Sequence, residues 1–138
     1  MTLRRALAAA SGAEGVFAGQ VWHIPDRLLT FADPDPSRRT LHPERPVLVV
    51  QGDDIGVNAR CPTVLVMPLS SNTANRRPWE ETLAGDETPL DRPSVVKVHL
   101  LQPIPRRTLI EEAEWAGDAE AALLRILARL VANLGLVG

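Results

Sequence analysis

Two short runs of apolar, largely β-branched residues in the middle of the chain constrain its fold most strongly. Residues 46–50 read PVLVV and residues 63–67 read TVLVM, and a connection that contains glycine and aspartate separates them. β-Branched residues favour strands, and an apolar run of this length without polar alternation is typical of a buried strand. We therefore expect these two strands to form the centre of a sheet.

Weaker strand patterns lie on both sides of this centre. Residues 19–24 predict a first strand that Pro25 ends, because proline cannot donate to a strand ladder. Residues 79–83 and 94–100 predict two further strands, and the turn-forming residues 85–91 lie between them. Strands at this spacing indicate an antiparallel barrel or sandwich.

Helical patterns mark the two ends of the chain. Near the C-terminus, apolar residues recur at helical spacing, and we expect one amphipathic helix that Asp118 caps, that Gly135 ends and that packs on the sheet. Residues 2–10 favour a short appended helix, whereas residues 25–44 contain several prolines and predict a long loop. We divide the chain into an N-terminal extension, 1–15, and one barrel domain, 16–138.

Composition places the chain among ordinary globular proteins. Its 138 residues suffice for one domain, and 45% hydrophobic with 23% charged residues is compatible with a packed core. Cys61 is the sole cysteine, so no intrachain disulfide can form, and its apolar neighbourhood predicts a buried, inert thiol. No apolar window approaches the ~18 residues of a membrane span and no signal peptide is evident, so we expect a cytoplasmic protein that binds no membrane.

Charge is unevenly distributed along the sequence. The formal net charge is −2, so any nucleic-acid binding requires local clustering of basic residues. Acidic residues concentrate between positions 111 and 120, whereas most arginines lie between positions 38 and 107. The loops of the middle segment are therefore expected to form a basic face.

Four segments, in this order, resemble the MazF/PemK (Kid) toxins of type II toxin–antitoxin systems. They are RPVLVVQ from Arg45, TVLVMPLSSN at 63–72, LDRPSVVK at 90–97, and the final helix that ends in LGL at 134–136. The resemblance spans about residues 18–136. It implies a mainly β fold with α, an SH3-like antiparallel β-barrel with a C-terminal amphipathic helix. It also implies a homodimer and a cognate antitoxin whose disordered acidic segment wraps the toxin.

The resemblance also implies a reaction, the cleavage of single-stranded RNA without a metal or other cofactor. The ribose 2′-hydroxyl attacks the adjacent phosphorus, which requires a base, a cation for the developing charge and an acid for the leaving oxygen. Arg45 matches the catalytic arginine, and we expect it on the surface with little packing role. Ser70 matches a family residue that holds the phosphate, and Ser71 and Asn72 follow it into an RNA-contacting loop.

Three further residues are candidate RNA contacts, each with a simpler alternative. His42 precedes Arg45 in the long loop, where a histidine can also be an inert surface residue. Arg76 and Arg77 suit phosphate binding, but paired charges on turns also serve solubility alone.

The segment KVHLLQP at 97–103 departs from the family pattern. Lys97 matches a basic family residue, His99 stands where the family has an acid, and Gln102 and Pro103 replace an Arg-Thr pair. Side chains two residues apart lie on one face of a strand, so Lys97 and His99 are expected to share a catalytic site. An imidazole exchanges protons near neutral pH, although a structural, hydrogen-bonded His99 is the alternative.

Other functions remain open at this stage. The altered 97–103 segment favours a non-catalytic barrel of the same class, either a CcdB-like gyrase poison or an inactive MazF-like binding protein. The C-terminus lacks the Trp-Gly-Ile ending of such gyrase poisons, and no DNA-binding signature is present. We interpret His23 as structural and both Trp79 and Trp115 as packing anchors.

Overall fold

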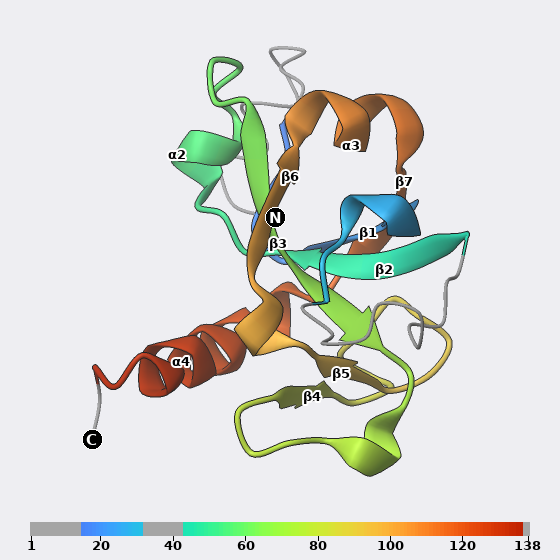
Figure 1. The fold of residues 1–138 in the computed structure, drawn as a ribbon, viewed down its shortest axis with the longest axis vertical. Helices are drawn as coiled ribbons and strands as arrows, with labels where there is room; N and C mark the ends of the chain where they lie inside the picture. Colours follow the sequence, from blue (N-terminus) through green and yellow to red (C-terminus); the bar gives the residue numbers. More distant parts are fainter. Residues whose placement is uncertain (1–14, 32–42, 137–138) are drawn as a thin grey trace.

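The computed structural model describes residues 15–31 and 43–136. Within them the chain forms a seven-stranded sheet whose strands run in the order β4-β5-β3-β2-β1-β7, with β6 also paired to β3 (Figure 1). The strands are β1 (Gln20–Pro25), β2 (Glu44–Val49), β3 (Thr63–Ser70), β4 (Glu81–Leu83), β5 (Ser94–Val96), β6 (Gln102–Pro105) and β7 (Glu114–Asp118). The α-helices are α2 (Asp53–Gly56), α3 (Arg106–Glu112) and α4 (Leu123–Asn133). Short 3-10 helices are η1 (Asp26–Leu28), η3 (Thr73–Asn75), η4 (Val98–Leu100) and η5 (Glu120–Ala122).

All strand pairs are antiparallel, and the sheet curls into a half-barrel that carries α4 at its C-terminal end. The predicted fold class, an antiparallel barrel with a C-terminal helix, is thereby confirmed. None of the helices in the described part of the chain has the length and apolar character that a membrane crossing requires. The predicted helix at 2–10, nearly all of the 1–15 extension and the loop at 32–42 lie outside the described residues.

Residues 47–49 of β2 and 66–69 of β3 are buried on both faces, which explains the apolar runs there, whereas Leu65 of β3 is 38% exposed. Leu48 faces a core cluster that includes Met67 and Ile126 of α4. Its neighbours Val47 and Val49 face the opposite cluster, to which α3 contributes its own apolar residue, Leu109. Consecutive side chains of a strand alternate between faces, so both must be apolar when helices lie on both sides. Figure 1 shows α3 and α4 on opposite sides of β3.

The predicted strand at 94–100 is wrong in its second half. The β3–β5 ladder ends after the pair Leu69–Val96, and residues 98–100 form η4 before β6 rejoins β3 at Gln102. Pro68 explains the interruption. Its carbonyl accepts a hydrogen bond from the Lys97 N–H at 2.9 Å, so its own missing N–H lies on the same side. The ladder therefore lacks a donor where Lys97 passes Pro68, and the chain leaves it as a 3-10 turn.

The C-terminal helix ends as predicted but begins differently. Asp118 is the last residue of β7, and Ala122 precedes the first turn of α4 without a side-chain cap, so the predicted Asp118 cap is wrong. At the other end Gly135 has a φ of 73°, a left-handed conformation that favours glycine. Its N–H bonds the Ala132 carbonyl at 3.0 Å, and the Leu136 N–H bonds the Val131 carbonyl at 3.3 Å, which is a Schellman end.

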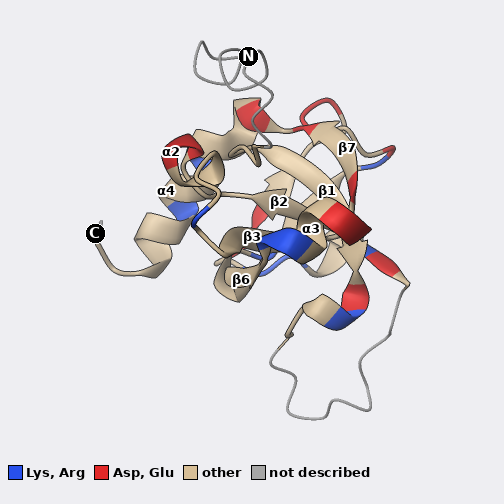
Figure 2. Ribbon diagram, turned by 90° about the horizontal axis from the view of Figure 1, so that it is seen from above, with Lys and Arg blue, Asp and Glu red and all other residues tan. Residues whose placement is uncertain are grey.

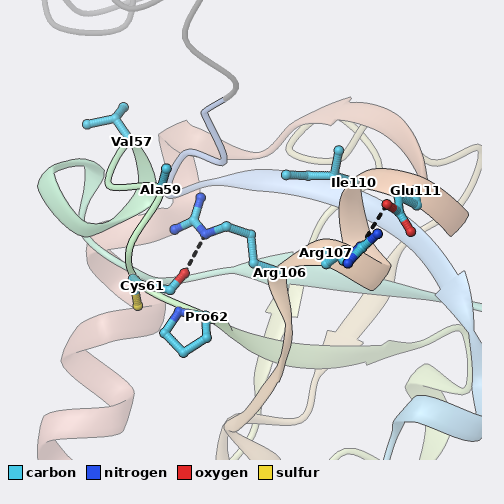
Figure 3. A pocket seen from close by; sticks show the side chains of 8 residues that line it. All are labelled: Val57, Ala59, Cys61, Pro62, Arg106, Arg107, Ile110 and Glu111. Atoms are coloured by element: carbon cyan, nitrogen blue, oxygen red, sulfur yellow. Dashed lines mark hydrogen bonds and ion pairs between the residues drawn. The ribbon is translucent and has the colours of Figure 1, made fainter.

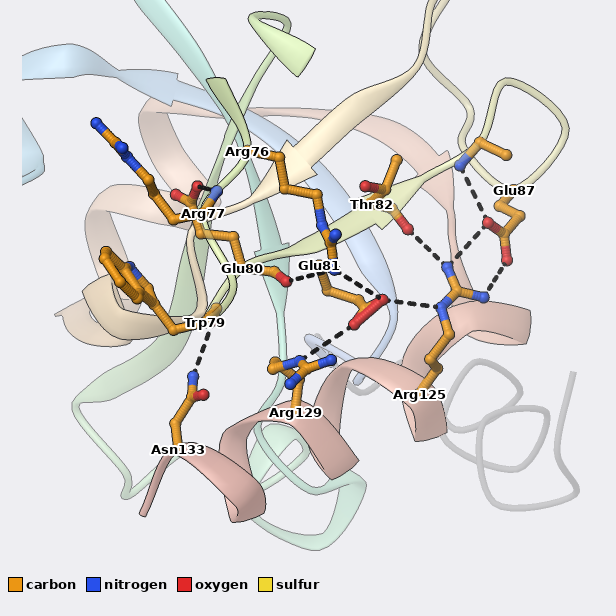
Figure 4. Close-up of polar contacts among 11 residues, drawn as sticks. Arg76, Arg77, Trp79, Glu80, Glu81, Thr82, Glu87, Arg125, Arg129 and Asn133 are labelled. Atoms are coloured by element: carbon orange, nitrogen blue, oxygen red, sulfur yellow. Dashed lines mark hydrogen bonds and ion pairs between the residues drawn. The ribbon is translucent and has the colours of Figure 1, made fainter. Parts of the chain in front are cut away.

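An arginine-carboxylate network ties α4 to the β4–β5 region (Figure 4). The Arg125 guanidinium donates to both Glu87 carboxylate oxygens, at 2.7 and 2.9 Å, and to the Thr82 carbonyl at 2.6 Å. One turn further along α4, Arg129 pairs with Glu81 at 3.4 Å. These contacts hold the helix against the hairpin in addition to its apolar face.

The Glu87–Arg125 pair predicts a specific acid sensitivity. The hydrogen bond from Arg125, followed by the one from the Ala84 N–H, lowers the pKa of Glu87 from 4.5 to about 2. Because the pKa of Glu87 is lower in the folded state than in the unfolded state, the pair stabilises the fold fully at pH values above the unfolded-state pKa. This contribution disappears as the pH falls toward 2. Glu87→Gln should lower the melting temperature at pH 7 and flatten its fall between about pH 5 and 2, as measured by circular dichroism.

Arg125→Gln provides the matched variant, since it removes the donor instead of the acceptor. It should reproduce the flattened acid limb, and the double variant should add little to either single change. Parallel melting curves for Glu87→Gln and the parent across this pH range would contradict the assignment.

Candidate functional site

A groove of about 410 Å³ lies where β1, β2, β3 and β5 meet the loop that precedes β5. Its lining residues are His23, Glu44, Arg45, Pro46, Leu69, Ser70, Ser71, Asn72, Leu90, Asp91, Arg92 and Ser94. Four of the predicted site residues, Arg45, Ser70, Ser71 and Asn72, thus lie together, although they come from positions about 25 residues apart. The groove contains two arginines, hydroxyl groups and an imidazole, which phosphate chemistry can use, and it also contains the carboxylates of Glu44 and Asp91.

Arg45 is held in place more firmly than the sequence predicts. Its Nε donates to the Asp26 carboxylate at 2.7 Å, and its guanidinium lies 4.7 Å from the centre of the Phe31 ring. Only 16% of the Arg45 side chain and 4% of the Asp26 side chain are exposed. The expectation of a surface arginine with little packing role is therefore wrong, and the guanidinium is oriented before any substrate arrives.

The serines and the asparagine follow directly from the end of β3. Ser70 is the last residue of that strand, and its Oγ accepts a hydrogen bond from the Asn72 N–H at 3.2 Å. This bond folds the chain back at the end of the strand, so Ser71 and Asn72 lie exposed along the groove. Hydroxyl and amide groups fixed in this way can donate to the oxygens of a bound phosphate.

Lys97 and His99 do not line this groove. Lys97 Nζ pairs with the buried carboxylate of Glu80 at 2.7 Å. His99 lies in η4 against the Trp79 ring, with centroids 5.9 Å apart, and its Nδ1 is 3.3 Å from the side-chain amide of Asn133. The expectation that both lie on one strand face fails, because the strand ends at Val96.

The remaining predicted contacts are dispersed. Arg76 donates to the Glu80 carbonyl at 3.1 Å, and the Arg77 backbone N–H donates to the Glu80 carboxylate at 2.7 Å, outside the groove. Figure 4 shows both arginines at the β4 end of the network. His42 lies outside the described residues.

The expected basic face is absent from the residues that the structure describes. Figure 2 shows acidic and basic segments interspersed over the ribbon. Most described cations are paired with carboxylates, as in Arg27–Glu112, Arg45–Asp26, Lys97–Glu80, Arg107–Glu111, Arg125–Glu87 and Arg129–Glu81. Any anion must therefore be bound by a few placed groups instead of a broad positive field.

Sequence reasoning missed several residues of the groove, among them His23 and Arg92. His23 was interpreted as structural, yet it lines the groove because its strand position pairs with Pro46, next to Arg45. A signal was present, since an antiparallel pairing of the first two predicted strands brings residue 23 beside the arginine. Arg92 belongs to the matched segment 90–97 and is exposed, with Asp91 at 3.5 Å.

A second cavity, about 560 Å³, lies between α3 and the loop after α2 (Figure 3). The guanidinium groups of its two arginines already bond to other groups of the protein. Arg106 is 7% exposed and donates to the backbone carbonyls of residues 55, 56 and 61, and Arg107 pairs with Glu111. Cys61 lines this cavity and is partly exposed, so the predicted buried thiol is wrong; the Thr63 backbone lowers its pKa.

A curled antiparallel half-barrel with a groove of this composition defines a class of small barrel proteins, and comparison with known proteins gives the family. The chain belongs to the family described as PemK-like, MazF-like toxins of type II toxin–antitoxin systems, whose model matches residues 28–134. No curated protein matches the chain.

Solved structures share the fold. MazF from Deinococcus radiodurans is 22% identical, with 88% of this chain and 97% of that chain covered and a TM-score of 0.60. A MazE–MazF structure from the same organism has 22% identity, 88% and 96% coverage and a TM-score of 0.59. A mycobacterial endoribonuclease in complex with its cognate antitoxin has 15% identity, 90% and 97% coverage and a TM-score of 0.58. At these identities the likeness establishes the fold alone.

Proposed function

We propose that this chain is the toxin of a type II toxin–antitoxin system and acts as an endoribonuclease on single-stranded RNA without a metal. The observation that carries the proposal is the groove, which joins Arg45 of β2 to the hydroxyl and amide groups that follow β3. Membership of the toxin family supports the same function.

Each group has a task in the reaction. The Arg45 guanidinium, fixed by Asp26, stabilises the negative charge that grows on the phosphoryl oxygens as the 2′-hydroxyl attacks. The Ser70 hydroxyl holds the scissile phosphate, and Ser71 and Asn72 contact the adjoining RNA. The reaction gives a 2′,3′-cyclic phosphate and a free 5′-hydroxyl, and it needs proton transfer at both oxygens.

We assign the proton transfer to His23, the imidazole that the groove contains among the described residues. An imidazole suits this role, because it can both accept and donate a proton. The roles predicted for Lys97 and His99 remain predictions, and in this chain both residues belong to the cluster around Glu80 and Trp79.

The partners follow from the family. We propose that the toxin is a homodimer in the cytoplasm and that an antitoxin blocks it with a disordered acidic segment. The solved MazE–MazF structures and the mycobacterial endoribonuclease bound to its antitoxin support such a partner. The competing function is a non-catalytic barrel, which the departure at His99 favours.

The test is single-turnover cleavage of single-stranded RNA in EDTA, across pH 5 to 9, with product ends identified by mass spectrometry. The parent should yield cyclic phosphates, with a rate that follows a histidine titration. The chain has three histidines, so His23→Gln, His42→Gln and His99→Gln form a complete matched set. His23→Gln should slow cleavage at least ~100-fold while RNA binding persists, because glutamine hydrogen-bonds but cannot exchange the proton.

The other outcomes decide between the alternatives. Slowing confined to His99→Gln or His42→Gln would transfer the proton-transfer role to that residue. No cleavage by the parent, with RNA still bound, would support the non-catalytic barrel.

A further inference from the structure

A side cavity of about 550 Å³ continues the groove toward β7. It is lined by His23, Glu44, Pro89, Leu90, Asp91, Glu114, Trp115 and Ala116. His23, Glu44, Leu90 and Asp91 line both spaces, so the two are contiguous. A chain molecule bound at Arg45 can therefore reach the side cavity past the residues that the two spaces share.

A solvent-exposed tryptophan lies in this side cavity. Trp115 stands on β7, which pairs only with β1 among the described strands, and it is 53% exposed. Its cross-strand partner Trp22 packs against the core, so the core does not need the second indole. The predicted role of Trp115 as a packing anchor is thus wrong. An exposed indole beside a nucleic-acid groove is suited to stacking, which is favourable for every base.

Carboxylates surround the tryptophan. Glu44 and Glu114 are exposed, and within residues 15–31 and 43–136 neither has an ion-pair partner. Asp91 also lines the side cavity and has a loose contact with Arg92 at 3.5 Å. This lining repels a phosphate and an acidic antitoxin segment alike, but it accepts hydrogen bonds from N–H groups on the edge of a base.

The wall opposite β7 is fixed in position. Gly117 has a φ of 137°, and a Cβ at this residue would lie 2.5 Å from the Cβ of Pro89. The loop at 89–91 therefore rests directly on β7 and needs the glycine to approach so closely. The side cavity is formed by packed elements before ligand binding, which reduces the entropic cost of binding.

We propose that the side cavity is a base-specificity subsite of the ribonuclease. It stacks one nucleobase that flanks the scissile phosphate on Trp115, and Glu44 and Glu114 accept hydrogen bonds from the exocyclic amino group of that base. Cytosine, adenine and guanine carry such a group, whereas uracil has a single N–H on that edge, between two carbonyl oxygens that the carboxylates repel. The inference rests on the proposed RNA cleavage and adds the feature of the substrate that this chain selects.

The experiment measures cleavage of short single-stranded RNAs varied at the positions on both sides of the cut, together with the Kd for 2′-O-methyl RNA, which cannot be cleaved. The parent should disfavour uracil at one flanking position. Trp115→Ala should abolish that preference and raise Kd about five- to 100-fold, with kcat nearly unchanged, because stacking binds substrate and transition state alike. Trp115→Phe should retain the preference, and Glu114→Gln should improve the relative use of uracil.

Trp79→Ala is the matched control, since Trp79 is 44% exposed but lines neither space. It should leave the base preference at that position unchanged. If Trp115→Ala keeps the parent's preference and Kd while cleavage persists, the subsite is wrong and the ribonuclease function stands. If Trp115→Ala lowers the mass of the protein in solution and keeps the base preference, this face is a protein interface. A parent protein that neither binds nor cleaves RNA would refute both proposals.

Discussion

Arg45→Lys should slow RNA cleavage by about 100- to 1,000-fold while changing the melting temperature little. Removing one preorganised donor to a developing oxyanion typically costs this much. In the parent, Arg45 Nε lies 2.7 Å from the buried Asp26 carboxylate. Lysine keeps a positive charge beside this carboxylate, so Asp26 still has a cationic partner. Lysine lacks the planar fork that contacts two phosphoryl oxygens at once. Single-turnover cleavage and thermal melting on the same preparations test this.

Arg45→Ala is the less informative variant, even though it should also abolish the growth arrest that we expect when cells produce the parent toxin. It removes the cation beside a carboxylate that is 4% exposed, and the loss of one partner from a buried pair costs about 3 kcal/mol. Lost activity would then reflect lost folding as much as lost chemistry. Arg107→Lys is the control for the substitution type, because Arg107 forms an exposed pair with Glu111 on α3. If Arg45→Lys cleaves within threefold of the parent, Arg45 is not the electrostatic stabiliser.

The central part of the fold could be predicted from the sequence because its signal is local. The apolar runs at β2 and β3 required burial on both faces, and Gly135 marked the end of α4 through its own backbone preference. By contrast, β6, α3 and β7 follow one another between residues 102 and 118 and are only four, seven and five residues long. Such short elements are specified by their neighbours, and their own periodicity is too brief to identify them.

The site divided along the same line. Arg45 and Ser70 came to one groove because each sits at a fixed place on a strand that the sequence identified. Lys97 and His99 lie outside the groove because of Pro68 on β3. Pro68 has no backbone N–H to donate to β5, and the sequence does not show that this N–H would be needed, since that depends on which strands pair. His23 and Trp115 could not be assigned to the groove and the side cavity from the sequence, because the β1–β2 and β1–β7 registers determine which residues lie beside them.

Arg106→Met should be the most destabilising single change outside the apolar core. The side chain is buried at the start of α3, and its guanidinium donates to three backbone carbonyls, at 2.7 to 2.8 Å, in the segment that joins β2 to β3. Figure 3 shows the bond to the Cys61 carbonyl. Methionine fills similar volume but leaves all three carbonyls without that donor, at a cost of about 1 kcal/mol or more for each.

We therefore expect urea denaturation to give a free energy of unfolding lower by about 3 kcal/mol or more, a large share of the total stability of a domain this size. Arg107→Met is the matched control, because it removes the adjacent arginine of the same helix. The Arg107–Glu111 pair has side-chain exposures of 87% and 58%, and solvent screening leaves such a pair with little effect on stability. The sequence alone does not distinguish the two arginines. In the structure, the Arg106 guanidinium donates to three backbone carbonyls of the loop between β2 and β3. A difference between the two variants below about 1 kcal/mol would mean that water satisfies the three carbonyls equally well, and that the guanidinium does not hold this loop.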